Sequence, residues 1–405
     1  MNPPPVNPQA VNPQAVNRPT VNQQAVSRLT DTDTDSRTDH PGKAAMTTTA
    51  EEQLQRPPAE LRYAEELAAL RAEDRDHRPP GWELSLRAAR RFIVGDEATG
   101  TTRKFVGDPA LVERALVTLA TNRGLLLVGE PGTAKSLLSE LIAAAVSGTS
   151  RLTVQGGAAT TEDQIKYSWN YALLVSEGPS TRSLVPAPML RGMAEGRVVR
   201  FEEITRCPLE VQDSLLSLLS ERVVAVPELD GPEGMVFARQ GFNVIATANT
   251  RDRGVNEMSS ALKRRFNFET VFPIPDLDTE LALVEAESGH LLRRSGVTAA
   301  PDRDLLEVLV TAFRELRAAE GGDRPSAVMS TAEAVSVAHT VGLRGWYLRG
   351  EPGNAADLVS SLAGTAAKDS PEDLARLRRY LEQRVPRRRG PHWQAVHDAR
   401  HLLAG

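Results

Sequence analysis

The stretch Gly124-Leu-Leu-Leu-Val-Gly129-Glu-Pro-Gly-Thr-Ala-Lys135-Ser136-Leu137 joins a short apolar run to a glycine-containing turn and a lysine–serine pair. It fits the pattern G-x-x-x-x-[GA]-K-[ST], which cradles phosphate when it lies between a buried strand and a helix. The glycines let successive N–H groups face a phosphate, and the positive end of the following helix adds to the attraction. We therefore predict that the nucleotide is bound by Gly129, Glu130, Pro131, Gly132, Thr133, Ala134, Lys135, Ser136 and Leu137.

Two residues of this loop have predicted roles of their own. Lys135 is expected to reach the β- and γ-phosphates, and the Ser136 hydroxyl is expected to ligate Mg²⁺. Ala134 stands where glycine is usual, which is tolerable if the position keeps right-handed backbone angles. ATP and Mg²⁺ are thus the expected cofactors, although the sequence does not distinguish ATP from GTP.

An acidic pair follows a second apolar run in Val198-Val-Arg-Phe201-Glu202-Glu203. A strand that ends in two acids fits the metal and water site of a P-loop ATPase. Glu202 stands where Asp is usual, and its longer side chain still reaches a metal-bound water. Glu203 is the expected base that polarises the attacking water. The competing interpretation is a pair of exposed acids at the end of a strand.

Two further motifs carry polar residues. The apolar run from Phe242 delivers Asn249 at its carboxyl end, where ligands bind in doubly wound sheets, so Asn249 is predicted to position the water. Arg264 and Arg265 lie too far along the chain to need a role in the same pocket. Such arginines act across a subunit interface, where they neutralise charge that develops on the γ-phosphate. Ordinary surface arginines are the alternative.

Strands and helices alternate outward from these motifs. Short apolar runs at 124–128, 152–155, 198–201 and 244–248 alternate with helical patterns at 111–121 and 136–147. This alternation predicts an α/β fold with a parallel sheet covered by helices on both faces. After Pro275 only helical patterns remain, which predicts an all-helical lid domain. The expected lid helices span 279–292, 302–319, 331–343, 357–366 and 371–383.

The chain divides into four predicted parts. Residues 1–30 form a degenerate Val-Asn-Pro-Gln-Ala repeat with few large apolar side chains, and acids alternate with Thr and Ser at 31–39, which together predict a disordered tail over 1–48. Residues 49–100 form an N-terminal helical extension, with helical patterns at 61–70 and 84–92. Residues 101–275 form the nucleotide-binding αβ domain, and 276–405 the lid with a C-terminal basic segment. Eight arginines against two acids at 376–400 predict a solvated basic helix face, or alternatively a contact with an acidic partner.

The composition excludes several classes of protein. The formal net charge is −5 over 405 residues, which does not favour a nucleic-acid partner. No apolar run approaches the roughly 18 residues of a membrane span, and the N-terminus has no signal-peptide pattern. The single cysteine, Cys207, allows no internal disulfide and suits a reducing compartment. We therefore expect a cytoplasmic protein without a membrane partner.

Taken together, the motifs resemble the MoxR group of AAA+ ATPases. The resemblance covers about 105–345 and includes Phe201-Glu-Glu-Ile-Thr-Arg206-Cys-Pro208, which is similar to the group's D-E-I-N-R-A-P. It implies a homo-hexameric ring with ATP at the subunit interfaces and Arg265 or Arg264 as the arginine finger. It also implies a chaperone-like activity on a von Willebrand factor A domain partner. The segments 160–178 and 223–241 resemble an insertion and a hairpin that face the pore or the partner.

The chain departs from this group in its lid. The group carries a second sensor arginine in a motif like S-P-R-A, whereas this chain has Met329-Ser-Thr-Ala332-Glu333, and Arg324 lies upstream. The absence of this arginine, and the presence of Glu202 in place of the usual Asp, keep an alternative function open. In that alternative the chain is a nucleotide-dependent binding scaffold with little hydrolysis. An NTPase of the McrB type that works with nucleic acid is a second alternative, because Ala261-Leu-Lys-Arg-Arg-Phe266 resembles that group too.

Overall fold

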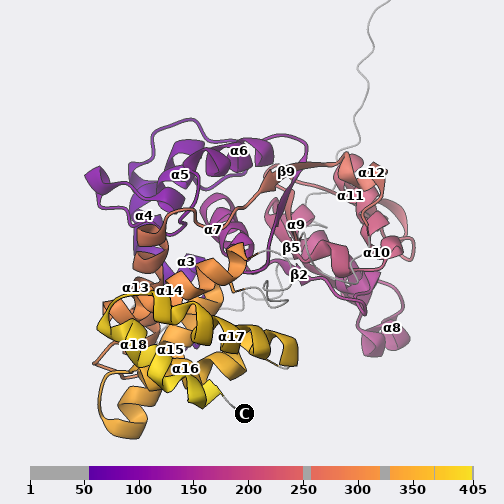
Figure 1. Cartoon of the computed structure of the whole chain (residues 1–405). Coiled ribbons are helices and arrows are strands. Elements are labelled where there is room, and N and C mark those ends of the chain that lie inside the picture. The colour runs from indigo at the N-terminus through magenta and orange to yellow at the C-terminus, as the bar shows by residue number, and fades with distance from the viewer. Residues whose placement is uncertain (1–53, 250–256, 320–328, 369, 404–405) are drawn as a thin grey trace, which may run out of the picture.

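The computed structural model describes residues 54–249, 257–319, 329–368 and 370–403 (Figure 1). The predicted tail, 1–48, and Arg324 lie outside the described residues. The described chain forms an αβ unit, shown from indigo to salmon in Figure 1, and a helical unit in orange and yellow beside it. Among the described residues, no helix combines the length and apolar character needed to cross a bilayer.

Five parallel strands form the central sheet, in the order β2-β5-β8-β1-β9. The predicted runs become four of these strands, and β1 lies between β8 and β9. Sequence reasoning missed the fifth strand, β9, which pairs with β1 at the edge of the sheet. The strands span Gly124–Gly129 (β1), Thr153–Gln155 (β2), Val198–Glu202 (β5), Asn243–Asn249 (β8) and Phe266–Thr270 (β9).

Alternate side chains of β1 pack into two separate hydrophobic cores, because successive side chains of a strand point to opposite faces of the sheet. Leu125 and Leu127 are buried with α5, α6 and α7 on one face of the sheet. Leu126 is buried on the other face with residues of α9 and α11. The covering helices are α5 (Leu86–Val94), α6 (Pro109–Leu119), α7 (Lys135–Ser147), α9 (Pro188–Glu195), α10 (Leu209–Asp213), α11 (Leu215–Ser220) and α12 (Ser260–Lys263). The predicted covering of both faces is therefore confirmed.

The N-terminal extension packs into the first of these cores. Its predicted first helix is divided into α3 (Ala59–Arg62) and α4 (Ala64–Glu73), and Leu67 and Leu70 of α4 are buried. Glu140 of α7 accepts hydrogen bonds from the Ala59 N–H and from Arg56. The extension is thus anchored to the helix that follows the phosphate loop.

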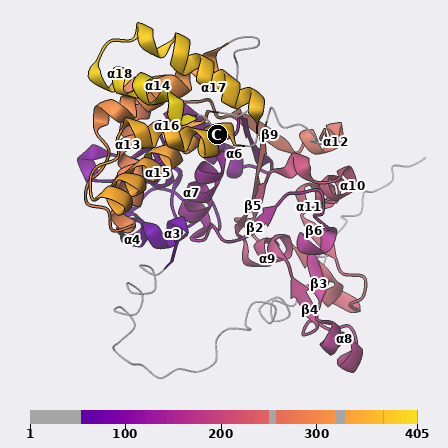
Figure 2. The same cartoon turned by 60° about the horizontal axis from the view of Figure 1, so that its bottom comes forward.

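Two antiparallel ribbons extend from the sheet. The segment predicted as an insertion, 160–178, contains β3 (Tyr167–Trp169) and α8 (Tyr171–Glu177). The ribbon continues beyond that segment to β4 (Leu184–Pro186), which pairs with β3, and it projects from the body of the molecule (Figure 2). We call β3, α8 and β4 the arm. The predicted hairpin is formed by β6 (Val223–Ala225) and β7 (Met235–Phe237).

The helical unit has a third hydrophobic core of its own. Its helices are α13 (Leu277–Arg294), α14 (Arg303–Ala318), α15 (Thr331–Arg349), α16 (Ala355–Leu362), α17 (Pro371–Gln383) and α18 (Pro391–Asp398). The five predicted lid helices are present, and α15 is a turn and a half longer than expected. The basic segment 376–400 does not form one helix face, because α17 ends at Gln383 and α18 begins after Gly390.

Candidate functional site

The phosphate loop joins the carboxyl end of β1 to the start of α7, as predicted. Gly132 has a φ of +76°, which glycine adopts without steric cost and which curls the loop. The loop lines a cavity of about 470 Å³ together with Glu203, which follows β5, and residues from β8 and the lid. Its lining includes Glu130, Pro131, Gly132, Thr133, Ala134, Lys135, Ser136, Leu137, Glu203, Thr247, Asn249, Arg317, Ser330 and Thr331.

The right-handed backbone that would make Ala134 tolerable without strain is not observed. Ala134 has φ 64° and ψ 25°, which is the left-handed conformation and not the right-handed one. A side chain with a Cβ atom costs roughly 1–2 kcal/mol in this region, because the Cβ approaches the following carbonyl oxygen. Ala134 therefore carries strain that glycine would not, directly before the first residue of α7.

Lys135 is held inside the curl of the loop. Its Nζ donates hydrogen bonds to the carbonyl oxygens of Gly129, at 3.1 Å, and of Glu130, at 2.7 Å. The residue is buried and still lines the cavity. The ammonium charge therefore lies where the loop N–H groups and the positive end of α7 also attract phosphate.

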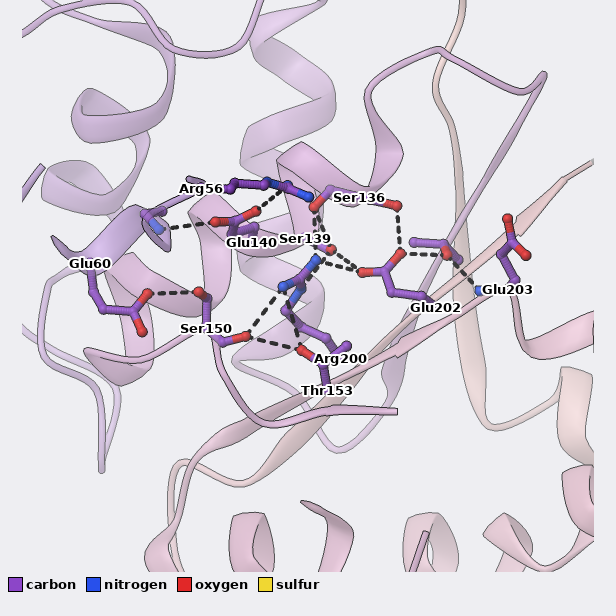
Figure 3. Close-up of polar contacts among 12 residues, drawn as sticks. Arg56, Glu60, Ser136, Ser139, Glu140, Ser150, Thr153, Arg200, Glu202 and Glu203 are labelled. Carbon is purple, nitrogen blue, oxygen red and sulfur yellow. Dashed lines mark hydrogen bonds and ion pairs between the residues drawn. The ribbon is translucent and has the colours of Figure 1, made fainter. Parts of the chain in front are cut away.

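Glu202 lies at the centre of a polar network at the end of β5 (Figure 3). Its Oε2 accepts hydrogen bonds from Ser136 at 2.7 Å and from Thr247 at 2.8 Å. Its Oε1 accepts from Ser139 at 2.7 Å and from Arg200 at 2.8 Å. The carboxylate is thus fixed against the serine that was predicted to ligate the metal.

The charge state of Glu202 follows from these contacts. Burial by itself would raise the pKa of the carboxyl, because it disfavours the charged form. The Arg200 charge and the hydroxyl hydrogen bonds outweigh burial, so the pKa lies below its ordinary value. Glu202 is therefore an anion at neutral pH, as a metal-binding carboxylate must be.

Sequence reasoning missed Arg200, which is only 8% exposed. Its guanidinium donates to Ser139 Oγ and Glu202, and to the carbonyl oxygens of Ser136 and Ser150. The available signal was an arginine in the otherwise apolar run Val198–Phe201, two residues before Glu202 and therefore on the same face of the strand. Its interactions connect β5 to both ends of α7.

This network continues to the N-terminal extension (Figure 3). Ser150, whose carbonyl oxygen accepts from Arg200, donates its own hydroxyl to Glu60 of α3 at 2.6 Å. Ser150 therefore connects Glu60 to Arg200, and Arg200 in turn contacts Glu202. The extension thus supports the metal side of the site as well as the hydrophobic core.

Glu203 adopts a different geometry from Glu202. Its backbone is left-handed, with a φ of 56°, and its N–H donates to Thr247 Oγ1 at 2.9 Å. The turn directs the Glu203 side chain away from the Glu202 network (Figure 3) and into the lining of the cavity. There it pairs with Arg206 at 2.9 Å and is partly exposed. A strained residue at a ligand cavity is typical of a functional position.

Asn249 ends β8 beside the phosphate loop. It is the register partner of Gly129 in the parallel pair of β8 and β1, and it lines the cavity. The structure thus brings Asn249 together with Lys135, Ser136 and Glu203. All the predicted residues of the intrasubunit site therefore lie around one cavity or directly behind it.

The two arginines predicted to act between subunits lie elsewhere. Arg264 is exposed, and Arg265 donates its Nε hydrogen to Ser220 Oγ at 2.5 Å. Neither is among the described residues that line the cavity of this chain. Their action between subunits stays a prediction.

The residues present fit a magnesium nucleotide. Ser136 and Glu202 present a hydroxyl and an ionised carboxylate 2.7 Å apart, and Mg²⁺ prefers oxygen ligands of this kind. The Glu202 carboxylate is longer than the usual aspartate, but it meets Ser136 directly. The sequence alone did not establish that contact.

The fold and the site define a P-loop nucleotide-binding protein. The model of the AAA domain (dynein-related subfamily) matches residues 124–266, which include β1, β5 and β8. The model of the YehL-like AAA+ ATPase C-terminal domain matches residues 278–404, which form the helical unit. YehL of Escherichia coli (strain K12) is 62% identical over 354 residues, 86% of this chain and 98% of YehL. The chain therefore belongs to the YehL-like family of MoxR-type AAA+ ATPases.

More distant relatives share only part of the chain. The chaperone MoxR1 of Mycobacterium tuberculosis is 29% identical over 233 residues, 56% of this chain and 54% of MoxR1. This chain thus spans about half the length of MoxR1. The solved structure of NtrX from Brucella abortus has a TM-score of 0.45 and 14% identity, covering 74% of this chain and 65% of NtrX.

Proposed function

We propose that this chain hydrolyses ATP with Mg²⁺ at the interfaces of a homo-hexameric ring in the cytoplasm, and that it remodels or matures a protein partner. One observation carries the hydrolysis. Lys135, Ser136, Glu203 and Asn249 line a single cavity, and Glu202 accepts a hydrogen bond from Ser136. These are the groups that neutralise phosphate charge, hold the metal and orient water in phosphoryl transfer.

Each residue has a distinct role in this proposal. Lys135 neutralises charge on the terminal phosphates, and Ser136 with Glu202 would hold Mg²⁺, which would supply further neutralisation of phosphate charge. Glu203 accepts a proton from the attacking water, and Asn249 orients that water. The ion pair with Arg206 is through Oε2 of Glu203, and the partly exposed carboxylate has further acceptor sites for the water.

The position of Arg265 supports the ring. It lies outside the cavity of its own chain and at the surface, where a neighbouring subunit can be reached. An arginine supplied in trans stabilises transition-state charge and is worth about 10³–10⁵ in rate. A head-to-tail interface that closes on itself would bring Arg265 of one subunit to the cavity of the next.

The arm supports the partner. Tyr171 and Val175 of α8 are 72% and 87% exposed and lie four residues apart, so they form an apolar pair on one face of the projecting helix. The relative MoxR1 is named a chaperone. We assign the arm to contact with a protein partner, of which a von Willebrand factor A domain protein is the expected example.

The deciding experiment is steady-state ATP hydrolysis at several protein concentrations for wild type, Glu203→Gln and Arg265→Ala. The specific activity of wild type should rise with concentration, and each variant should lose at least about a hundredfold in rate. A mixture of the two inactive variants should recover activity, because about a quarter of randomly formed interfaces then combine an intact Glu203 with an intact Arg265.

The mixing result separates the alternatives. No recovery, with both variants folded and able to bind ATP, contradicts action across an interface. If wild type binds ATP but hydrolyses it no faster than Glu203→Gln at any concentration, the chain is a nucleotide-dependent scaffold.

A further inference from the structure

The side of the cavity formed by the lid carries a cluster of charged residues that the preceding roles do not use. Glu280 of α13 is fully buried and is contacted by two arginines of α14, Arg314 and Arg317. Thr331, at the start of α15, also donates to Glu280 at 2.7 Å. One carboxylate thus faces two guanidinium groups, and the cluster keeps a surplus positive charge.

Only one of the two arginines faces the nucleotide cavity. Arg317 lines it together with Lys135, Ser330 and Thr331, whereas Arg314 is not among the described lining residues. Arg314 turns instead to the carbonyl oxygens of Ile274 and Pro275. Two arginines on one helix therefore share an anchor but differ in their access to the site.

Arg317 is close to the phosphate end of the cavity. Its Nη1 donates to the Met329 carbonyl oxygen at 2.8 Å, one residue before Ser330. Ser330 packs against the phosphate loop so closely that a Cβ atom built on Gly132 would lie 2.2 Å from the Ser330 Cβ. Arg317 is therefore connected to Gly132 of the phosphate loop through Met329 and Ser330, which are adjacent in the chain.

The guanidinium also keeps donors for a ligand. Arginine has five N–H donors, and the contacts of Arg317 with described residues go through Nη1 and Nη2 to Met329 and Glu280. Buried Glu280 fixes its orientation, and the side chain of Arg317 is 14% exposed. The first turn of α15, with its positive dipole end, lines the cavity beside it and favours an anion there.

We infer that Arg317 binds the terminal phosphates of ATP from the lid side and takes the place of the arginine absent from the run 329–333. This inference rests on the proposed function for the identity of the ligand. It requires nucleotide binding, but it does not require hydrolysis. Arg317 would close the lid on the phosphates, and Glu280 would hold it in place.

The test is calorimetric titration of the full chain with Mg²⁺ and either ATP or ADP, in a Glu203→Gln background that prevents turnover. Arg317→Met should raise the Kd for ATP by about tenfold to a hundredfold, the worth of a hydrogen bond to a charged group. The loss for ADP should be smaller, because ADP has one phosphate fewer. Arg317→Lys should recover part of the affinity, since it keeps the charge.

Arg314→Met is the matched control, because it removes the other partner of Glu280 at a side chain that is not itself among the described lining residues of the cavity. It should lower the urea midpoint about as much as Arg317→Met and leave the Kd for ATP within about threefold of the parent. Equal effects of the two substitutions on ATP affinity would overturn the inference. If Arg317→Met does not fold, Arg317→Lys against Arg314→Lys provides the same comparison.

This design separates the two proposals. A specific loss of ATP affinity in Arg317→Met supports the inference even if wild type proves unable to hydrolyse ATP. Conversely, active hydrolysis with equal effects of Arg314→Met and Arg317→Met keeps the proposed function and refutes the role of Arg317.

Discussion

Replacing Arg200 by methionine should strongly destabilise the αβ unit. Methionine keeps a straight apolar side chain but removes the charge next to Glu202. Arg200 and Glu202 are 8% and 5% exposed and lie 2.8 Å apart, so the substitution leaves a buried carboxylate without its cation. Breaking a buried ion pair from one side costs about 3–5 kcal/mol. The lost hydrogen bonds to the Ser136 and Ser150 carbonyls act in the same direction.

The assay is urea denaturation of the full chain, followed by circular dichroism. Arg191→Met is the control, because Arg191 forms an exposed pair with Glu195 one turn along a helix, and such pairs contribute about 0.3–0.5 kcal/mol. A double variant with Glu202→Gln should show at least about 1 kcal/mol of coupling between positions 200 and 202. If Arg200→Met loses no more stability than Arg191→Met, the buried-pair reasoning is wrong.

The pH dependence provides a second check. In wild type the pKa of Glu202 lies below its ordinary value of 4.5, so the ionised carboxylate contributes stability above that pH and loses it as the pH falls. Without Arg200, burial should raise this pKa instead. The deficit of Arg200→Met should therefore be largest near neutral pH. It should begin to shrink above pH 4.5, as the pH falls through the raised pKa of the variant, and should continue to shrink below pH 4.5 as wild type loses its own stabilisation. A deficit that stays constant from neutral to acid pH would contradict the assignment.

Two further substitutions test the backbone and the lid. Ala134→Gly should raise the thermal midpoint by the equivalent of about 1 kcal/mol, because glycine adopts the left-handed conformation of this position without strain, and ATP affinity should be retained. A lower midpoint would contradict the observed backbone angle. Gly342→Ala should destabilise the lid by about 1–3 kcal/mol, because its Cβ would lie 2.5 Å from a methyl carbon of Leu292 where α15 packs on α13. Shortening that leucine in Leu292→Ala/Gly342→Ala should make the glycine substitution less costly, and strictly additive losses would count against the proposed clash.

The phosphate loop could be predicted because its geometry is local. Contiguous residues make the turn, and the strand before it and the helix after it are visible in the sequence. The buried strands β5 and β8 were equally clear, since both faces of each are covered and the runs are therefore apolar apart from Arg200 and Thr247. The acidic pair and Asn249 followed, because parallel strands place their carboxyl ends at one edge of the sheet.

Strand β9 was missed for the opposite reason. It lies at the edge of the sheet and pairs only with β1, so Phe266 is the one buried residue of the strand and the other four are partly or fully exposed. Phe268 is 47% exposed there, and the five residues lack the continuous apolar character of a central strand. The strand forms because β1 offers an unpaired edge for hydrogen bonding, and the local sequence of β9 does not indicate that this edge is available.

The sequence by itself determined the class of fold and the chemistry of the phosphate loop, because periodicity and short-range turns are encoded in neighbouring residues. Only the tertiary structure decided how the site is held. Arg200 meets Glu202 beside α7, Ala134 takes a left-handed backbone, and Arg317 reaches the cavity from a helix that begins more than 160 residues after the loop. These features depend on packing between distant elements, in which the burial of one charge fixes the position of its partner.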